Sequence, residues 1–438
     1  MTEKKSTHNP PTLEKKMILP FLIVSSLFAL WGFANAVTDP MVQAFKKVLE
    51  LSNAQAAWVQ MAFYGGYFCM ALPAAYFVRK YNYKIGIIIG LSLYAGGALL
   101  FYPAAITEQF WFFCLGLYIL TFGLAFLETT ANPYIISMGS PATGTRRLNL
   151  AQAFNPLGLL MGLLVAQQFV LKRLQSDDIE SFAALDEAKK ILIRTSDLMV
   201  IRDPYVILGL FVLGFLILIS LVKMPLAKEE GAVPPLGKTL LALFEKKMYR
   251  MGVFAQAFYV GAQIMCWTYI YQYAEARGIS NTDAATYQFG AFVLFLLGRM
   301  IGTYLLQYIN AAQLLRGFAV LAGVCTLLTI GSTGTFGMFA LVCISFFMSI
   351  MFPTIYGETL SGLNVSDTKI GAAALVMAIV GGALMPKFQG NIIDLGGDGV
   401  ADLQWMGISE INLSFALPLL SFIYIFYYSS LLVANAKK

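Results

Sequence analysis

Residues 109–138 read QFWFFCLGLYILTFGLAFLETTANPYIISM, and Glu128 is the only charged residue among these thirty. A helix needs about 20 mostly apolar residues to cross the hydrocarbon core of a bilayer, so this stretch is predicted to span a membrane. The rest of the chain is similar, because 58% of its 438 residues are hydrophobic and 12% are charged, whereas about 25% are charged in an ordinary soluble domain. This composition excludes a soluble globular protein and predicts an all-α integral membrane protein.

Long apolar stretches broken by charged residues recur along the whole chain. Shifting the sequence by 220 residues places Pro133 on Pro353 and Gly162 on Gly382, which favours two related halves with a substrate site between them near the membrane midplane. We predict twelve spans, near residues 18–45, 54–79, 84–106, 109–138, 147–171, 204–224, 250–275, 284–308, 312–330, 335–357, 369–390 and 410–434.

Two longer polar segments, 172–203 and 225–249, interrupt these spans, and the second divides them into six and six. The predicted inner segments hold 19 of the 30 Lys and Arg residues, whereas the short outer loops hold four, so we expect both termini to be cytoplasmic. The expected order is an N-terminal tail (1–17), a six-helix bundle (18–224), a cytoplasmic central loop (225–249), a second six-helix bundle (250–434) and a C-terminal tail (435–438).

The sequence lacks the residue groupings that enzymes and metalloproteins use. Its one histidine, His8, lies in the N-terminal tail, so neither an H-E-x-x-H zinc motif nor a histidine-based triad is present. The five cysteines lie inside apolar runs and are odd in number, and a net charge of +6 is too small and scattered for a nucleic-acid surface. We therefore expect no enzymatic activity, cofactor, metal, nucleic-acid partner or obligatory protein partner, and a monomer embedded in the lipid bilayer.

Two carboxylates at membrane depth, Asp39 and Glu128, are the strongest functional candidates, because a charged group is costly to place there. Trp31 and Asn35 share a helical face with Asp39, and Asn132 shares a face with Glu128. A carboxyl group in an apolar cavity can exchange a proton near neutral pH, which proton-coupled transport requires. The alternative is a structural role, in which each carboxylate is paired with a basic group or lies near a helix end.

Amide and aromatic side chains complete a plausible cavity. Amides bind hydroxyl groups as donors and acceptors, and an aromatic face packs on the apolar side of a sugar ring, so this combination suits a neutral sugar. The alternative is hydrogen bonding between helices, which amides also provide in membranes. We assign Arg299 to a conformational gate or helix-end pairing. The stripe on span 250–275 is Gln256, Tyr259, Gln263, Trp267 and Tyr271, and the other candidates are Gln152, Asn155, Gln60 and Tyr64.

Four phrases of the sequence resemble the bacterial L-fucose:proton symporter family, within the fucose/galactose/glucose branch of the major facilitator superfamily. They are Trp31 to Asp39, Leu127 to Tyr134, Arg147 to Asn155, and Tyr259 to Gln263 with Cys266 and Trp267.

The resemblance implies twelve helices in two pseudo-symmetric bundles, alternating access and proton-driven sugar uptake across the bacterial inner membrane. It also implies that Asp39 couples protons, that Glu128 takes part in sugar recognition and protonation, and that Gln152, Asn155 and Gln263 are polar groups of the cavity.

Some residues depart from the family pattern, which has asparagines where this chain has Ala36 and Thr38 and a serine at Pro156. We therefore expect a symporter that imports a neutral monosaccharide, with L-fucose as the first candidate. Glucose or galactose, sodium as the coupling ion, and a non-transporting sugar sensor remain alternatives.

Overall fold

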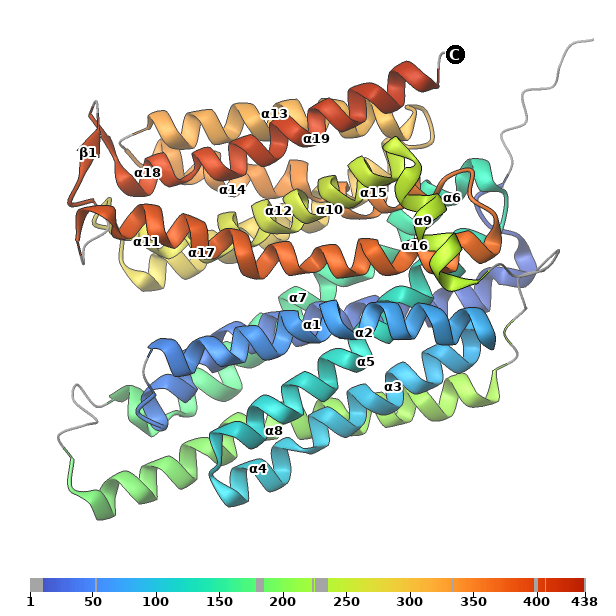
Figure 1. Cartoon of the computed structure of the whole chain (residues 1–438). Coiled ribbons are helices and arrows are strands. Elements are labelled where there is room, and N and C mark those ends of the chain that lie inside the picture. The colour runs from blue at the N-terminus through green and yellow to red at the C-terminus, as the bar shows by residue number, and fades with distance from the viewer. Residues whose placement is uncertain are drawn as a thin grey trace, which may run out of the picture.

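The computed structural model describes residues 11–51, 53–178, 185–222, 224, 235–332, 334–397, 401–405 and 407–436. Within these ranges, the side chains of residues 39–44, 46, 47, 53–57, 60, 171, 177, 178, 281 and 282 lie outside the description. The described chain is a bundle of long helices in two halves that lie side by side, with the N-terminal half in blue and green and the C-terminal half in yellow to red (Figure 1).

The N-terminal half contains six rods, two of which are broken. Helix α1 packs against α7, and α3 packs against both α5 and α8. The helices are α1 (Ile18–Val48), α2 (Asn53–Lys80), α3 (Tyr83–Leu99) with α4 (Phe101–Thr107), α5 (Phe110–Ser137), α6 (Gly144–Gln152) with α7 (Phe154–Val165), and α8 (Glu187–Leu221).

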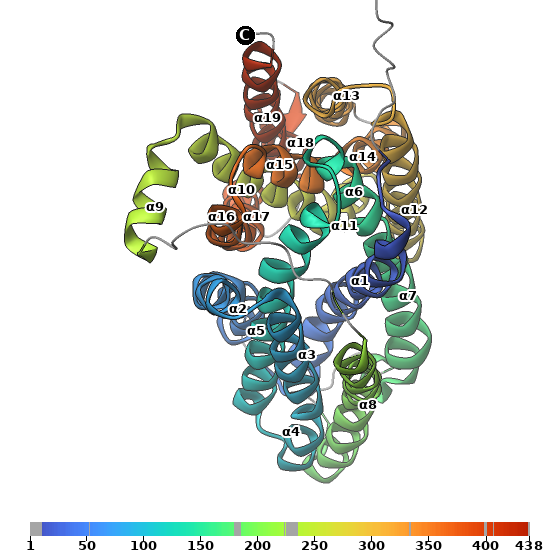
Figure 2. The same ribbon diagram turned by 90° about the vertical axis from the view of Figure 1, so that its right-hand side faces the viewer.

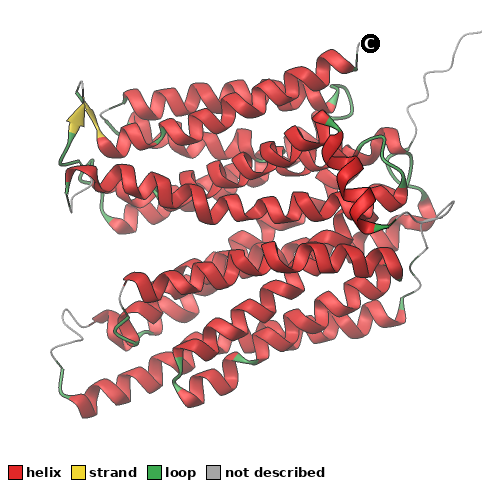
Figure 3. Ribbon diagram, viewed as in Figure 1, coloured by secondary structure: helices red, strands yellow, loops and turns green. Residues whose placement is uncertain are grey.

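The C-terminal half repeats this arrangement with six more rods, and α13 packs against α14 and α19. A two-stranded antiparallel hairpin, β1 (Gln404–Trp405) and β2 (Ile408–Ser409), lies at one end (Figure 3). The helices are α10 (Lys247–Thr268) with α11 (Ile270–Glu275), α12 (Asn281–Leu305), α13 (Ala311–Gly331), α14 (Phe336–Met348) with α15 (Met351–Leu360), α16 (Val365–Met377) with α17 (Gly381–Ile393), and α18 (Glu410–Ser414) with α19 (Ala416–Asn435).

Prolines explain four of the breaks. The breaks fall at Leu100, Ala153, Ile350 and Phe415, each three residues before a proline. Proline lacks a backbone N–H, and its ring clashes with the carbonyl of the fourth preceding residue, so the hydrogen-bond ladder opens there. Neighbouring helices in a membrane bundle tolerate such breaks.

Eleven of the described helical segments are long and apolar enough to cross a membrane by length and composition. The rod formed by α10 and α11 makes a twelfth. It falls outside that group because three amides, Gln256, Gln263 and Gln272, lower its hydropathy. The expected twelve-helix fold is therefore confirmed. Large apolar side chains such as Leu221 (78% exposed) and Phe211 (57% exposed) cover the outer surface, as a lipid-facing surface requires.

Two segments expected to be polar loops contain helix. Helix α8 begins at Glu187, well before the expected span at 204, because the mixed charges and apolar residues of 187–203 continue the same helix through Pro204. Helix α9 (Leu236–Glu245) lies within the central segment 225–249 and packs Leu243 against the bundle. Seen from one end, α9 projects sideways beside α10 and α16 (Figure 2).

Candidate functional site

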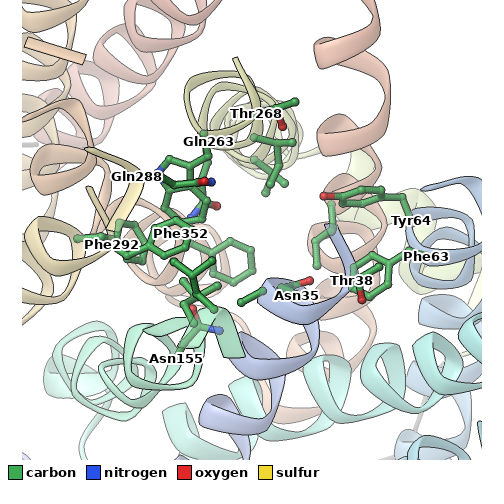
Figure 4. A pocket seen from close by; sticks show the side chains of 18 of the residues that line it. Asn35, Thr38, Phe63, Tyr64, Asn155, Gln263, Thr268, Gln288, Phe292 and Phe352 are labelled. Atoms are coloured by element: carbon green, nitrogen blue, oxygen red, sulfur yellow. The ribbon is translucent and has the colours of Figure 1, made fainter. Parts of the chain in front are cut away.

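A cavity of about 700 Å³ lies between the two halves, within the usual size range of small-molecule sites. Its wall mixes amides, phenols and aromatic rings with Glu128, Glu275 and Arg299. Asn35, Thr38, Phe63 and Tyr64 face Gln263, Gln288, Phe292 and Phe352 across the opening, and Asn155 lies below them (Figure 4).

Glu128 lies in the wall contributed by α5 and is partly exposed to the cavity. Asn132, one turn further along α5, donates from Nδ2 to Oε2 of Glu128 at 2.6 Å. Gln152 at the end of α6 donates from Nε2 to Oδ1 of Asn132 at 2.9 Å. No lysine or arginine in the described part of the chain forms an ion pair with Glu128. The carboxylate is thus held toward the cavity by a buried amide.

Close packing of α1 on α7 places two amides in the wall. A Cβ atom on Gly32 would overlap the backbone of Asn155, and one on Gly158 would overlap the carbonyl oxygen of Ala29. Small residues at such crossings let membrane helices approach closely. Asn155 then reaches across to donate from Nδ2 to the carbonyl oxygen of Phe28 at 3.3 Å. Asn35 lines the same wall.

The C-terminal half supplies an aromatic wall. The ring of Trp267 lies 4.8 Å from Phe292 and 5.2 Å from Phe295, in edge-to-face geometry. Its indole Nε1 donates to Oγ of Ser345 at 3.1 Å, which fixes the ring. Gln263, one turn before Trp267, adds a donor and an acceptor to the wall. A rigid apolar face next to an amide suits a ligand with both C–H and hydroxyl surfaces.

Arg299 of α12 is 2% exposed and reaches the N-terminal half. Its Nη1 donates to the carbonyl oxygen of Gln152 at 3.2 Å and to Oε1 of the same residue at 3.4 Å. A Cβ atom on Gly298 would overlap the carbonyl oxygen of Phe346, so this glycine lets α12 approach α14 beside Arg299. Arg299 therefore contacts both halves at the cavity wall.

The structure brings most of the predicted site residues together. Trp31, Asn132 and Gln256 were predicted to line the cavity, but they are buried behind its wall. The prediction failed because helical periodicity identifies a buried face without showing which neighbouring helix covers it. The side chains of Asp39 and Gln60 lie outside the described part of the structure. Ten predicted residues line the cavity: Asn35, Tyr64, Glu128, Gln152, Asn155, Tyr259, Gln263, Trp267, Tyr271 and Arg299.

Sequence reasoning missed several lining residues. Gln288, Phe292 and Phe295 follow one face of α12 toward Arg299, at a spacing of three or four residues. That periodicity was a usable signal, but two phenylalanines resemble ordinary core residues. Thr38 was noted only as a departure from the family pattern, and Phe63 offered no sequence signal, because apolar residues are common in spans. The described residues contain no cluster of three or more His, Cys, Asp or Glu side chains that could hold a metal ion.

The cavity is closed at one end by hydrogen bonds between the halves. Nδ2 of Asn149 donates to Oγ1 of Thr354 at 3.1 Å, and Oγ1 of Thr145 donates to Oε1 of Glu358 at 2.8 Å. Nε of Arg79 donates to Oγ of Ser366 at 3.0 Å. The opposite end of the cavity reaches the exposed side chain of Glu275, where α11 ends. The cavity is therefore open to one side of the molecule only.

Comparison with known proteins gives consistent findings. The family model described as Major Facilitator Superfamily matches residues 21–386. The chain is 52% identical to an L-fucose-proton symporter of Haemophilus influenzae, over 96% of this chain and 98% of that protein. It is 31% identical to a glucose/galactose transporter of Brucella abortus, over 96% of both chains.

A solved structure has the same architecture. The crystal structure of the major facilitator superfamily transporter FucP in the outward conformation superposes with a TM-score of 0.84. The two proteins are 34% identical, and the match covers 95% of this chain and 99% of that chain.

Proposed function

The chain belongs to the major facilitator superfamily, in the family of L-fucose-proton symporters, and we propose that it imports L-fucose together with protons by alternating access. The protein is a multi-pass membrane protein, and it is a transporter and not an enzyme. The observation that carries the proposal is a cavity between the halves, with an amide-supported Glu128 and no paired cation among the described residues.

The cavity wall supports a neutral sugar as the substrate. Amides from both halves, including Asn35, Asn155 and Gln263, offer donors and acceptors for hydroxyl groups. The ring of Trp267 supplies an apolar face for the C–H side of a pyranose. A binding site shared by the two halves also lets sugar binding favour closure, since the halves then contact one ligand. We propose Asn35, Asn155, Gln263, Trp267 and Glu128 as the principal sugar contacts.

The coupling groups proposed here are Asp39 and Glu128. A carboxylate placed in the cavity without an ion-pair partner can take up a proton when sugar enters and release it on the other side. Inter-half bonds such as Asn149–Thr354 close the opposite end while the cavity is open. Import then requires these bonds to break and the mouth near Glu275 to close.

We propose that the closed end faces the cytoplasm of a bacterial inner membrane. The first described residues and the C-terminal end of α19 lie at this end (Figure 1). Arg79, Lys80, Lys84, Arg146 and Arg147 lie on or beside the helix ends there, which agrees with the excess of basic residues on the cytoplasmic side of membrane proteins. The open cavity consequently faces outward.

The proposal is tested by the pH of a lightly buffered, anaerobic suspension of de-energised cells that express the protein. Adding L-fucose should make the medium more alkaline, since inward symport removes protons from it. D-galactose, D-glucose and empty-vector cells are the comparisons. Alkalinisation by D-glucose or D-galactose alone would keep the mechanism and change the substrate.

The specific alternative is transport of glucose or galactose, which the Brucella abortus relative is named for. Sodium as the coupling ion would leave the pH constant while making uptake depend on sodium. A non-transporting sensor would bind sugar without any accumulation. Uptake of labelled L-fucose, D-galactose and D-glucose with and without sodium separates these possibilities.

A further inference from the structure

A chain of hydrogen bonds crosses from the C-terminal half to Glu128. Arg299 donates from Nη1 to Oε1 of Gln152 at 3.4 Å, Gln152 donates from Nε2 to Oδ1 of Asn132 at 2.9 Å, and Asn132 donates from Nδ2 to Oε2 of Glu128 at 2.6 Å. In each of these three hydrogen bonds, the donor lies on the Arg299 side and the acceptor on the Glu128 side. The three donors are each 5% exposed or less, so little water reaches them from the cavity.

We propose that Arg299 and Glu128 form an amide-bridged ion pair that joins the two halves at the cavity wall, with Asn132 and Gln152 as positioning residues that make the inter-half contact depend on the charge of Glu128. This inference rests on the proposed function, because it assigns how a proton on Glu128 would reach the C-terminal half. It concerns the transporter without sugar, so it can be tested separately from substrate identity.

The charges at the two ends account for the direction of the bonds. A charged carboxylate is an acceptor without donors, and a hydrogen bond to it is shorter and stronger than one between neutral groups. Arg299 carries a buried charge that forms no ion pair within the described residues. Two polarised amides between the ends let each charge stabilise the other without direct contact.

Few other charges act at either end. The described titratable groups that act electrostatically on Glu128 are the phenols of Tyr67 on α2 and Tyr356 on α15, and Tyr259 on α10 faces Arg299. Phenols in water ionise near pH 10, far above the range of the test below. Most basic groups on helices that pack against α5 are held elsewhere. Lys84 donates to the carbonyl of Ser220, Arg147 to that of Ile135, and Arg79 to Oγ of Ser366. Lys80 lies over the ring of Tyr81 and Lys369 over the ring of Tyr83.

The bridge has a consequence for transport. While Glu128 is charged, the bridge holds Gln152 and Arg299 together, which favours the outward-open arrangement seen here. A proton on Glu128 removes the negative end and weakens the contact, so the inward-open arrangement becomes more accessible. The empty carrier would then return to the outward side without its proton, as import requires.

The experiment measures the distance between spin labels at the outer ends of the two halves, without sugar, at pH 8 and pH 5. The labels replace Lys189 on α8 and Thr335 before α14, both exposed, in a variant whose five native cysteines are replaced. We expect the population with the shorter distance to rise about fivefold at pH 5, the change that the loss of one net hydrogen bond gives.

Variants locate the source of this pH response. Glu128→Gln, Arg299→Gln and Gln152→Leu should each show the shorter distance at both pH values, whereas Arg299→Lys should keep part of the response. Gln389→Leu is the matched control, since Gln389 is a buried amide that donates to Oγ of Ser414 at 3.0 Å, outside the bridge. It should respond as the parent does.

Two results would overturn the inference. One is a parent protein whose distances do not change with pH. The other is a full pH response that persists in each of the single variants Glu128→Gln, Arg299→Gln and Arg299→Lys when these are monodisperse. A separate titration with L-fucose tests the proposed function. A carrier of another sugar would fail that titration and still show the pH response of the bridge.

Discussion

Glu128 places a charge in the middle of α5, and the described residues give it an amide partner, Asn132, at 2.6 Å. A carboxylate held in this way can accept hydrogen bonds from sugar hydroxyls without first breaking an ion pair. Its neighbours Gln152 and Asn155 keep the surrounding wall polar. We propose that the residue combines a proton site with a sugar contact, and substitutions can test the two roles separately.

Replacing Glu128 with alanine should weaken L-fucose binding by roughly 10- to 100-fold, because hydrogen bonds to a charged group contribute about 1.5–3 kcal/mol. Isothermal titration of the purified protein measures the loss. Gln389→Ala is the control, as it removes a buried amide that does not line the cavity. Unchanged affinity in Glu128→Ala would remove this residue from the sugar site.

Replacing Asp39 with asparagine should abolish accumulation of sugar against a gradient while leaving exchange of labelled for unlabelled sugar. The amide cannot carry a proton, but it keeps the size and polarity of the side chain. Uptake by energised vesicles, compared with exchange in de-energised ones, measures the two activities. Undiminished accumulation would show that protons couple elsewhere.

Single residues differ in how well the sequence predicted them. Glu128 could be identified as a cavity residue because a charge in an apolar run is rare and costly. Asp39 was predicted on the same ground and stays a prediction, since its side chain lies outside the described part of the structure. Gln256 was assigned to the cavity by periodicity, yet it is fully buried, and Thr38 was missed although it lines the wall. The helix that covers a given face is determined by packing between spans that are distant in sequence. A local sequence pattern does not show which spans pack together.

At the scale of elements, polarity and small residues position the cavity. The amides on α10 and α11 lower the hydropathy of that rod, so it is the least apolar of the twelve, although the sequence predicted a span at 250–275. Expected and observed spans otherwise agree within a few residues, because long apolar runs are a strong signal. Helix α9 and the start of α8 escaped prediction, since their mixed composition is typical of loops as well as of exposed helices.

Substituting alanine for Gly158 should destabilise the protein by about 1–3 kcal/mol, as overpacking of a tight contact does. A Cβ atom there would overlap the carbonyl oxygen of Ala29 and push α7 away from α1. Gly214→Ala is the matched control, because nothing lies within 4 Å of a Cβ atom at that position of α8. Thermal unfolding in detergent should show a lower Tm for the first variant only, and equal values would contradict the packing described here.

At the scale of the whole molecule, two sets of contacts between the halves act at different depths. The bonds Asn149–Thr354 and Thr145–Glu358 close the end that we propose faces the cytoplasm, while Arg299 contacts Gln152 beside the cavity. Both sets must break before the cavity can open inward. Packing inside each half survives this change, since α1 with α7 and α13 with α19 belong to the same half. The halves are therefore expected to move as rigid bodies.

Gly357 offers a direct test of this movement, because it lies on α15 where that helix meets α6 of the other half. A Cβ atom at this position would lie 2.6 Å from Oγ1 and 3.1 Å from Cα of Thr145, so a valine leaves no room for the closed inner end. Gly357→Val should thus shift the population from outward-open to inward-open, and labels at Lys189 and Thr335 should move closer together. Gly317→Val on the exposed face of α13, with nothing within 4 Å, should leave the distance unchanged. A folded Gly357→Val protein with the parent's distances would mean that the inner contact does not determine which side the cavity faces.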